Sequence, residues 1–267
     1  DVSVLTELPA GRAAITTHVV PAVEKPGYMQ RTWQRVREEV EAGRQVYVVC
    51  PRISSAGQAA SDLDGLESVL DVLDAEQQAA PMANVEDVLA QLADGPLQGL
   101  RIDALHGRMS ADDKDWAMRR FAAGPNASDG IDVLVSTTVI GVGVDVPNAS
   151  VMVVMDADRF GVSQLHQLRG RVGRGGLPGL CLLVTNAEPG SPARDRLDAV
   201  AATNDGFELS KVDLLARREG DVLGSDQSGR TNSLRVLSLL RDESIIVAAR
   251  DEADRIVAAD PLLANHP

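Results

Sequence analysis

Up to residue 185, segments with the apolar pattern of a strand alternate with segments that have the apolar pattern of a helix. Short runs rich in Val, Ile and Leu, with the length and β-branched content of buried strands, occupy 13–20, 44–50, 100–107, 131–138, 150–157 and 179–185. Segments with helical spacing lie between them, over 27–43, 85–95, 110–124 and 161–171. In the first, Met29, Trp33, Val36 and Val40 share one helical face. This alternation predicts an α/β fold, a parallel sheet flanked by helices. Ligand loops are expected at the carboxyl ends of the strands, among them 105–107, 136–149 and the glycine–arginine run within 164–176.

The pattern changes after residue 187, where strand-like runs end. Two helices are expected on either side of Asn204, Asp205 and Gly206, and a further helix over 233–260. We therefore predict a linker over 1–12, an α/β lobe over 13–188 and a helical region over 189–267, which begins with a helical hairpin and ends in C-terminal helices. Within the lobe, the Ala-, Asp- and Gln-rich segment 51–84 is expected to be a surface insertion.

Composition and charge limit the classes of function that fit the sequence. A formal net charge of -13 argues against nucleic-acid binding by overall charge, so any DNA contact must rest on local charge. Cys50 and Cys181 lie in strand-like runs and are expected to be buried free thiols. The Cys and His residues lack metal-ligand spacing, so no metal site is expected. No apolar run reaches the ~18 residues that cross a bilayer, which predicts a cytoplasmic protein with no membrane contact.

The stretch 164–176, "QLHQLRGRVGRGG", places Arg169, Arg171 and Arg174 among glycines. Guanidinium groups match phosphate oxygens, and glycine lets the backbone approach a ligand. However, the sequence has no Gly-Lys-Ser/Thr phosphate cradle. Its one Asp-Glu pair, Asp242-Glu243, lies in a helical stretch and not at the end of an apolar strand, so it does not resemble a magnesium-binding pair. A shared site is the economical interpretation, in which another domain holds a triphosphate and Arg171 and Arg174 reach its γ-phosphate. The alternative is a helix end with solvated charges.

Three segments resemble motifs of superfamily 2 helicases, namely 105–110 "LHGRMS", 133–149 "VLVSTTVIGVGVDVPNA" and 167–174 "QLRGRVGR". The longer stretch 158–175 is similar to the RecG branch and to its relative Mfd, and 203–229 resembles the translocation motif that both share. The following "LRVLSLLRDESII" favours RecG. The resemblance implies the second RecA-like lobe of an ATP-dependent double-stranded DNA translocase and helicase, with its translocation hairpin. Such proteins remodel stalled forks and Holliday junctions in recombination and repair.

The resemblance also implies roles for individual residues. Arg171 and Arg174 would contact the γ-phosphate, and Gln167 would sense the state of the nucleotide. The other implied residues are Gly143 and Asp145 on the nucleotide side, His106, Gly107, Thr137 and Thr138 on the DNA side, and Arg217 and Gln227 in DNA coupling. ATP with Mg²⁺ would be bound mainly by a first lobe that this sequence lacks, so the chain alone is expected to be inactive. The implied partners are branched DNA and the first lobe and fork-binding domain of the same protein, which acts as a monomer at the bacterial nucleoid.

Plainer interpretations stay open. Thr137 and Thr138 could cap a strand end, His106 could be structural or solvated, and Asp145 could fix a turn before Pro147. The sequence also departs from the RecG pattern, because Gly141 stands where that pattern has Glu. Rival functions are an Mfd-like transcription-repair coupling module and a module that binds branched DNA or a protein without hydrolysing ATP.

Overall fold

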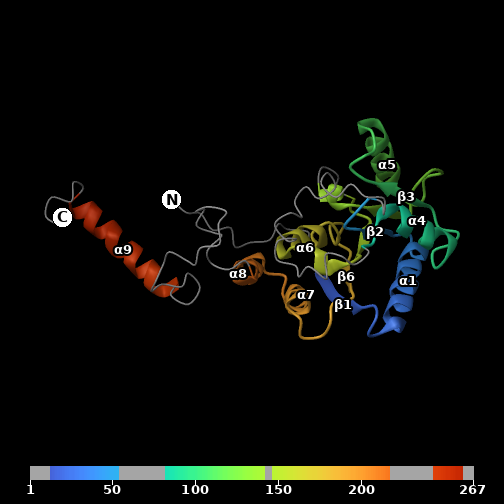
Figure 1. Ribbon diagram of the computed structural model, residues 1–267. Helices are drawn as coiled ribbons and strands as arrows, with labels where there is room; N and C mark the ends of the chain where they lie inside the picture. Colours follow the sequence, from blue (N-terminus) through green and yellow to red (C-terminus); the bar gives the residue numbers. More distant parts are fainter. Residues whose placement is uncertain (1–12, 54–81, 142–145, 217–242, 261–267) are drawn as a thin grey trace. The chain divides into compact units, whose positions relative to one another are not determined.

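The structure is a computed structural model that describes residues 13–53, 82–141, 146–216 and 243–260 (Figure 1). The chain divides into two compact units, Asp1–Leu209 and Ser210–Pro267. The first unit contains the whole sheet and the helices around it. Of the second unit, the structure describes the end of one helix and one further helix.

The first unit is built on a six-stranded sheet in the order β1-β6-β5-β2-β4-β3. Its strands are β1 (Ile15–Pro21), β2 (Gln45–Val49), β3 (Ile102–Leu105), β4 (Val133–Ser136), β5 (Ala149–Val154) and β6 (Gly179–Thr185). Every neighbouring pair is parallel, which confirms the predicted α/β class. All residues of β2, β4 and β5 are buried, as expected for central strands that are covered on both faces.

Helices connect the strands, and three more follow the last strand in the part of the chain that the structure describes. The structure describes α1 (Pro26–Glu41), α4 (Val85–Asp94), α5 (Ala111–Ala123), α6 (Val162–Arg169), α7 (Pro192–Ala202), α8 (Gly206–Ala216), α9 (Glu243–Ala259) and the 3-10 turns η1 (Thr138–Gly141) and η2 (Ala157–Arg159). The side chain of Ser110 caps α5 by accepting from the backbone N–H of Asp113 at 3.1 Å, as its sequence position predicted. Within the described residues, no helix has the length and apolar character needed to span a membrane.

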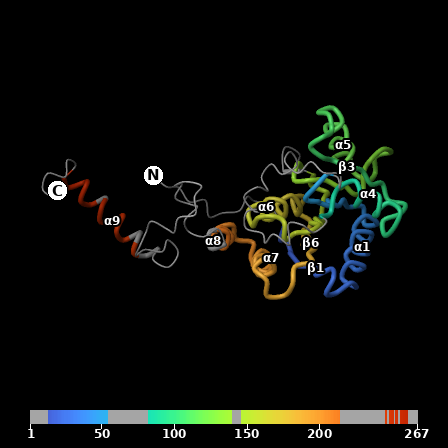
Figure 2. The backbone as a smooth tube through the Cα atoms, viewed as in Figure 1, coloured from blue at the N-terminus to red at the C-terminus, as the bar shows by residue number. Residues whose placement is uncertain are grey.

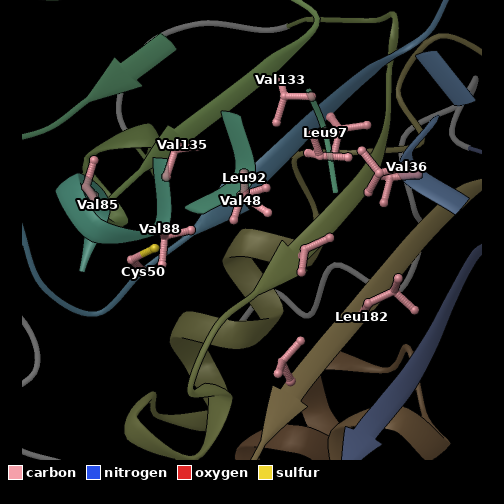
Figure 3. Packing of buried hydrophobic residues seen from close by; sticks show 14 of the residues in the cluster. Val36, Val48, Cys50, Val85, Val88, Leu92, Leu97, Val133, Val135 and Leu182 are labelled. Carbon is pink, nitrogen blue, oxygen red and sulfur yellow. The ribbon is translucent and has the colours of Figure 1, made fainter. Parts of the chain in front are cut away.

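The helices cover both faces of the sheet (Figure 2). On one face, α1 and α4 pack over alternate residues of the strands (Figure 3); this cluster includes Val36, Val46, Val48, Cys50, Val85, Val88, Leu92, Val133, Val135, Val151, Val153, Leu182 and Val184. On the opposite face, Tyr47 of β2 meets Phe121 of α5 with ring centroids 4.8 Å apart. Since Tyr47 alternates with Val46 and Val48 along the strand, the two layers follow directly from the period of a strand.

Two observations bear on the predicted domain limits. Helix α7 packs against β1, α6 and η2, so it is part of the first unit although it follows residue 188. The segment 51–84 leaves and rejoins the lobe at neighbouring points, because Arg52 and Asn84 form a parallel bridge. Its interior, residues 54–81, lies outside the described residues.

Candidate functional site

The glycine–arginine run begins where α6 ends. The N–H of Gly170 donates to the carbonyl oxygen of His166 at 3.1 Å and closes the last turn of the helix. Gly173 then adopts a φ of 74°, a left-handed conformation that favours glycine. Its carbonyl oxygen accepts from the N–H of Ala13 at 3.1 Å, just before β1. The run is thereby held beside the first residues of β1 and β6.

This location corrects the expectation that the arginine run follows a strand at its carboxyl end. The run follows α6, which starts after the carboxyl end of β5 and returns the chain toward the start of β6. In a parallel sheet the connecting helix runs antiparallel to the strands. The arginines therefore lie at the amino edge of the sheet.

Arg169 is a structural residue, in contrast to the two arginines that follow it. Its side chain is 2% exposed. Its Nη1 donates to the carbonyl oxygens of Val200 and Thr203, both at 2.8 Å, and its Nη2 lies 2.7 Å from Nδ1 of His166. Burial lowers the pKa of the Arg169 guanidinium below its usual range. Arg169 thus ties the end of α6 to the end of α7, and it also borders the hollow that Arg171 and Arg174 line.

Arg171 and Arg174 line one hollow of about 560 Å³, together with His166, Gln167 and Asn204. Both arginines are half-buried, and Gln167 is exposed. The Nε of Arg174 donates to the carbonyl oxygen of Gly170 at 2.9 Å, which orients the guanidinium. Two guanidinium groups in a half-enclosed hollow, of which that of Arg174 is oriented by a hydrogen bond, can bind an anion such as a phosphate. The structure therefore brings the three predicted nucleotide-side residues of this run together.

Ala13, Ala14 and Ile15 also line this hollow, and Asn204 donates from Nδ2 to the carbonyl oxygen of Ile15 at 3.0 Å. The sequence pattern marks Asn204 only as a break between two helices. Its role in the wall of the hollow depends on how α7 returns to the start of β1, which local sequence patterns do not encode.

The end of the segment 133–149 lies against the arginine run. A Cβ atom at Gly175 would overlap the carbonyl oxygen of Pro147 and lie 3.0 Å from the carbonyl carbon. Only glycine allows this close approach of two backbones. Gly143 and Asp145, the predicted nucleotide-side residues of this segment, lie outside the described residues.

The described residues that were predicted to face DNA lie at the other edge of the sheet. His106 and Gly107 follow β3, and Thr137 and Thr138 follow β4, which pairs with β3 in register. The N–H of Thr137 donates to the carbonyl oxygen of Leu105 at 3.3 Å, so the two loops start side by side. Thr137 is buried, Gly107 is exposed, and His106 and Thr138 are half-buried. Arg217 and Gln227 lie outside the described residues.

A second hollow, of about 610 Å³, lies between α1 and the strands β1 and β6. None of the predicted site residues lines it. Its wall contains Arg31 and Arg35, which form ion pairs with Glu38 at 2.6 Å and Glu39 at 2.6 Å. These arginines are already neutralised, so they give this hollow little affinity for an anion.

Comparison with known proteins places these features in a family. The model for the helicase conserved C-terminal domain matches residues 31–176, and the model for the C-terminal part of domain 3 of the ATP-dependent DNA helicase RecG matches residues 203–267. The chain is 51% identical over 268 residues to the ATP-dependent DNA helicase RecG of Mycobacterium leprae, with 100% of this chain and 34% of that protein covered. It is 40% identical over 261 residues to the RecG of Bacillus subtilis, with 97% and 33% covered.

The chain thus spans about a third of the length of the curated relatives that it matches. Among solved structures, it is similar to domain 2 of the DEAD-box helicase Mss116p bound to an RNA duplex, with 14% identity, a TM-score of 0.43, and 76% of this chain and 68% of that chain covered. Because one family model spans more than half of its residues, the chain belongs to the helicase conserved C-terminal domain family, and the RecG proteins are the relatives that it resembles along its whole length.

Proposed function

We propose that this chain is the C-terminal motor lobe of a RecG-type, ATP-dependent DNA helicase that moves along double-stranded DNA and remodels branched DNA in recombination and repair. The observation that carries the proposal is the shared hollow of Gln167, Arg171 and Arg174 in a chain similar to RecG over its full length. The match of residues 203–267 to the RecG model supports RecG over Mfd.

The nucleotide in this proposal is ATP with Mg²⁺, held mainly by a first lobe of the same protein. The residues that are present fit a phosphate, because two guanidinium groups line a half-enclosed hollow and a hydrogen bond orients that of Arg174. Arg171 and Arg174 would bind the γ-phosphate and stabilise the charge that develops during transfer. When bound, Mg²⁺ would neutralise part of the phosphate charge. Gln167 lines the same hollow and would report the presence of the nucleotide.

Two sets of residues serve DNA in this proposal. His106, Gly107, Thr137 and Thr138 would contact the backbone of the duplex at the carboxyl edge of β3 and β4. Arg217 and Gln227 would couple ATP hydrolysis to movement. The further partners are the first lobe and a fork-binding domain, and the protein would act as a monomer in the cytoplasm, at the bacterial nucleoid. This chain covers about a third of the length of its relatives, so the remaining two thirds of such a protein are long enough to hold both domains.

The test uses the whole protein that contains this chain and measures ATP turnover with and without forked DNA. Arg174→Ala is expected to lower turnover on the order of 10³-fold, the scale of an arginine finger, and Arg171→Ala should act similarly. Arg31→Ala, which removes an exposed arginine of α1, is the matched control and should leave turnover near normal. Near-normal turnover in Arg171→Ala and Arg174→Ala would refute the nucleotide role. The chain alone should not bind ATP tightly in a calorimetric titration.

A further inference from the structure

Trp116 is a large aromatic side chain that α5 presents to solvent. It is 53% exposed. The guanidinium carbon of Arg120 lies 4.4 Å from its ring centroid. Arg120 is itself fixed, because its Nη1 donates to Asp103 at 2.6 Å and its Nε to the carbonyl oxygen of Asp129 at 2.8 Å. A cation held over one face restrains the indole and leaves its remaining surface open to a partner.

The position of Trp116 links it to the proposed DNA edge. Helix α5 begins directly after the loop of His106 and Gly107, and Lys114 donates from Nζ to the carbonyl oxygen of Gly107 at 2.7 Å. At 1.5 Å per residue, Trp116 lies about 9 Å along the helix from its cap Ser110. Nucleotides of one DNA strand are about 3.4 Å apart along the duplex axis. A strand held at this loop therefore reaches Trp116 within about three nucleotides.

The charges on this face of α5 favour a polyanion over its C-terminal half. Arg119 lies one turn beyond Trp116 and is exposed. Within the described residues, Arg119 makes no hydrogen bond or ion pair. Asp112, Asp113 and Asp115 lie in the N-terminal half of the helix and would repel phosphate there. The strand would accordingly pass over Trp116 and Arg119.

The exposed aromatic side chains among the described residues are Tyr28, Trp116 and Phe207. Tyr28 also has a cation over its ring, Lys25 at 5.4 Å, but it belongs to α1 and is remote in sequence from both DNA loops. Trp116 alone combines an exposed ring, an exposed arginine on the same face and a helix that starts at a DNA loop. This combination favours nucleic acid over a protein partner.

We propose that Trp116 and Arg119 form a stacking site for an unpaired base, next to the edge that contacts duplex DNA. The bases of a continuous duplex are stacked on each other, so an indole finds a free base face only where pairing is broken. Arg119 would bind the neighbouring phosphate. The site would thereby distinguish a branch point from plain duplex. This inference rests on the proposed function and adds a residue that recognises branched substrates.

The experiment measures binding by the whole protein to two labelled DNAs, a continuous duplex and the same duplex with an unpaired arm. Trp116→Ala should weaken binding to the DNA with the arm about tenfold, the scale of one stacked base, and change binding to the duplex less than about twofold. Trp116→Phe should restore part of the difference. Tyr28→Ala is the matched control, since it removes an exposed aromatic ring beside a cation on another helix; it should bind both DNAs like the unvaried protein.

Two results would overturn the stacking site: no loss of binding in Trp116→Ala, or an equal loss on both DNAs. If the unvaried protein shows DNA-dependent ATP turnover while Trp116→Ala binds normally, only the stacking site is wrong. If the unvaried protein neither binds DNA nor turns over ATP, the proposed function falls with it.

Discussion

The guanidinium of Arg169 donates a 2.8 Å hydrogen bond to the carbonyl oxygen of Thr203, immediately beyond the end of α7. A second bond of the same length reaches Val200. Carbonyl groups at a helix end lack partners within the helix, and here a buried arginine from another helix supplies them. The bonds hold the end of α7 next to the hollow that contains Arg171 and Arg174.

Replacing Arg169 with methionine should lower the free energy of unfolding by about 3 kcal/mol, because the variant leaves buried carbonyl oxygens without donors. Urea unfolding of the chain measures the change. Arg119→Met is the matched control: it removes an exposed arginine and should change stability by less than about 0.5 kcal/mol. Equal changes in the two variants would contradict the structural role of Arg169.

The contact between Gly175 and Pro147 gives a second prediction. In Gly175→Ala, the new methyl group would overlap the Pro147 carbonyl, so one of the two backbones must move. We expect a loss of about 1–3 kcal/mol in stability and reduced ATP turnover in the whole protein, since Arg174 is the preceding residue. Gly27→Ala is the control, because nothing lies within 4 Å of a Cβ there. If Gly175→Ala were as stable and active as Gly27→Ala, the close contact between the backbones of Gly175 and Pro147 would not be needed for stability or turnover.

Sequence patterns predicted the strands and helices of the lobe well, because their signals are local. Helix α5 illustrates this, as Ser110 and the acidic first turn mark its start and Gly124 marks its end. The parallel class also follows from alternation along the chain. The order of the strands was not predicted, since it depends on contacts between residues distant in sequence, such as Ile15 with Gly179.

The candidate site was predictable in part. The residue types and spacing of Arg171 and Arg174 pointed to phosphate, and the structure places both in one hollow. The edge of the sheet was predicted wrongly, because a loop at the end of a helix was taken as a loop at the end of a strand. The burial of Arg169 could not be predicted either, since its partners Val200 and Thr203 are backbone carbonyls, which carry no signature in side-chain sequence.

Glu39 should make the stability of the lobe depend on pH. Burial alone favours its neutral form, but hydrogen bonds from Ser150 and Arg44 and the charges of Arg35 and Arg44 outweigh burial, so the pKa of Glu39 is lowered below its ordinary 4.5. A lowered folded-state pKa means that the unfolded chain binds the proton more readily. The stabilising contribution is therefore full above pH 4.5 and is lost as the pH falls through the lowered value.

Glu39→Gln tests this prediction. At neutral pH it should lose about 2 kcal/mol of stability, because it loses charge-assisted hydrogen bonds. Its free energy of unfolding should also fall less steeply than that of the unvaried chain as the pH is lowered below 4.5. Unfolding by urea at several pH values measures both effects. Parallel pH profiles would mean that another carboxylate is responsible for the acid sensitivity.

The two cysteines give the last prediction. Cys50 and Cys181 are free thiols with no exposed surface. Burial raises the pKa of Cys50 well above its usual range and that of Cys181 to about 12. The thiolate is the reactive form, so neither should react with a thiol reagent at neutral pH while the lobe is folded. In urea both should react, and in native buffer the labelling rate should follow the population of opened molecules. Arg169→Met should therefore speed the labelling of both cysteines, whereas Arg119→Met should not. Rapid labelling of either cysteine in the unvaried folded chain would show that its strand is not enclosed by the helices on the two faces of the sheet.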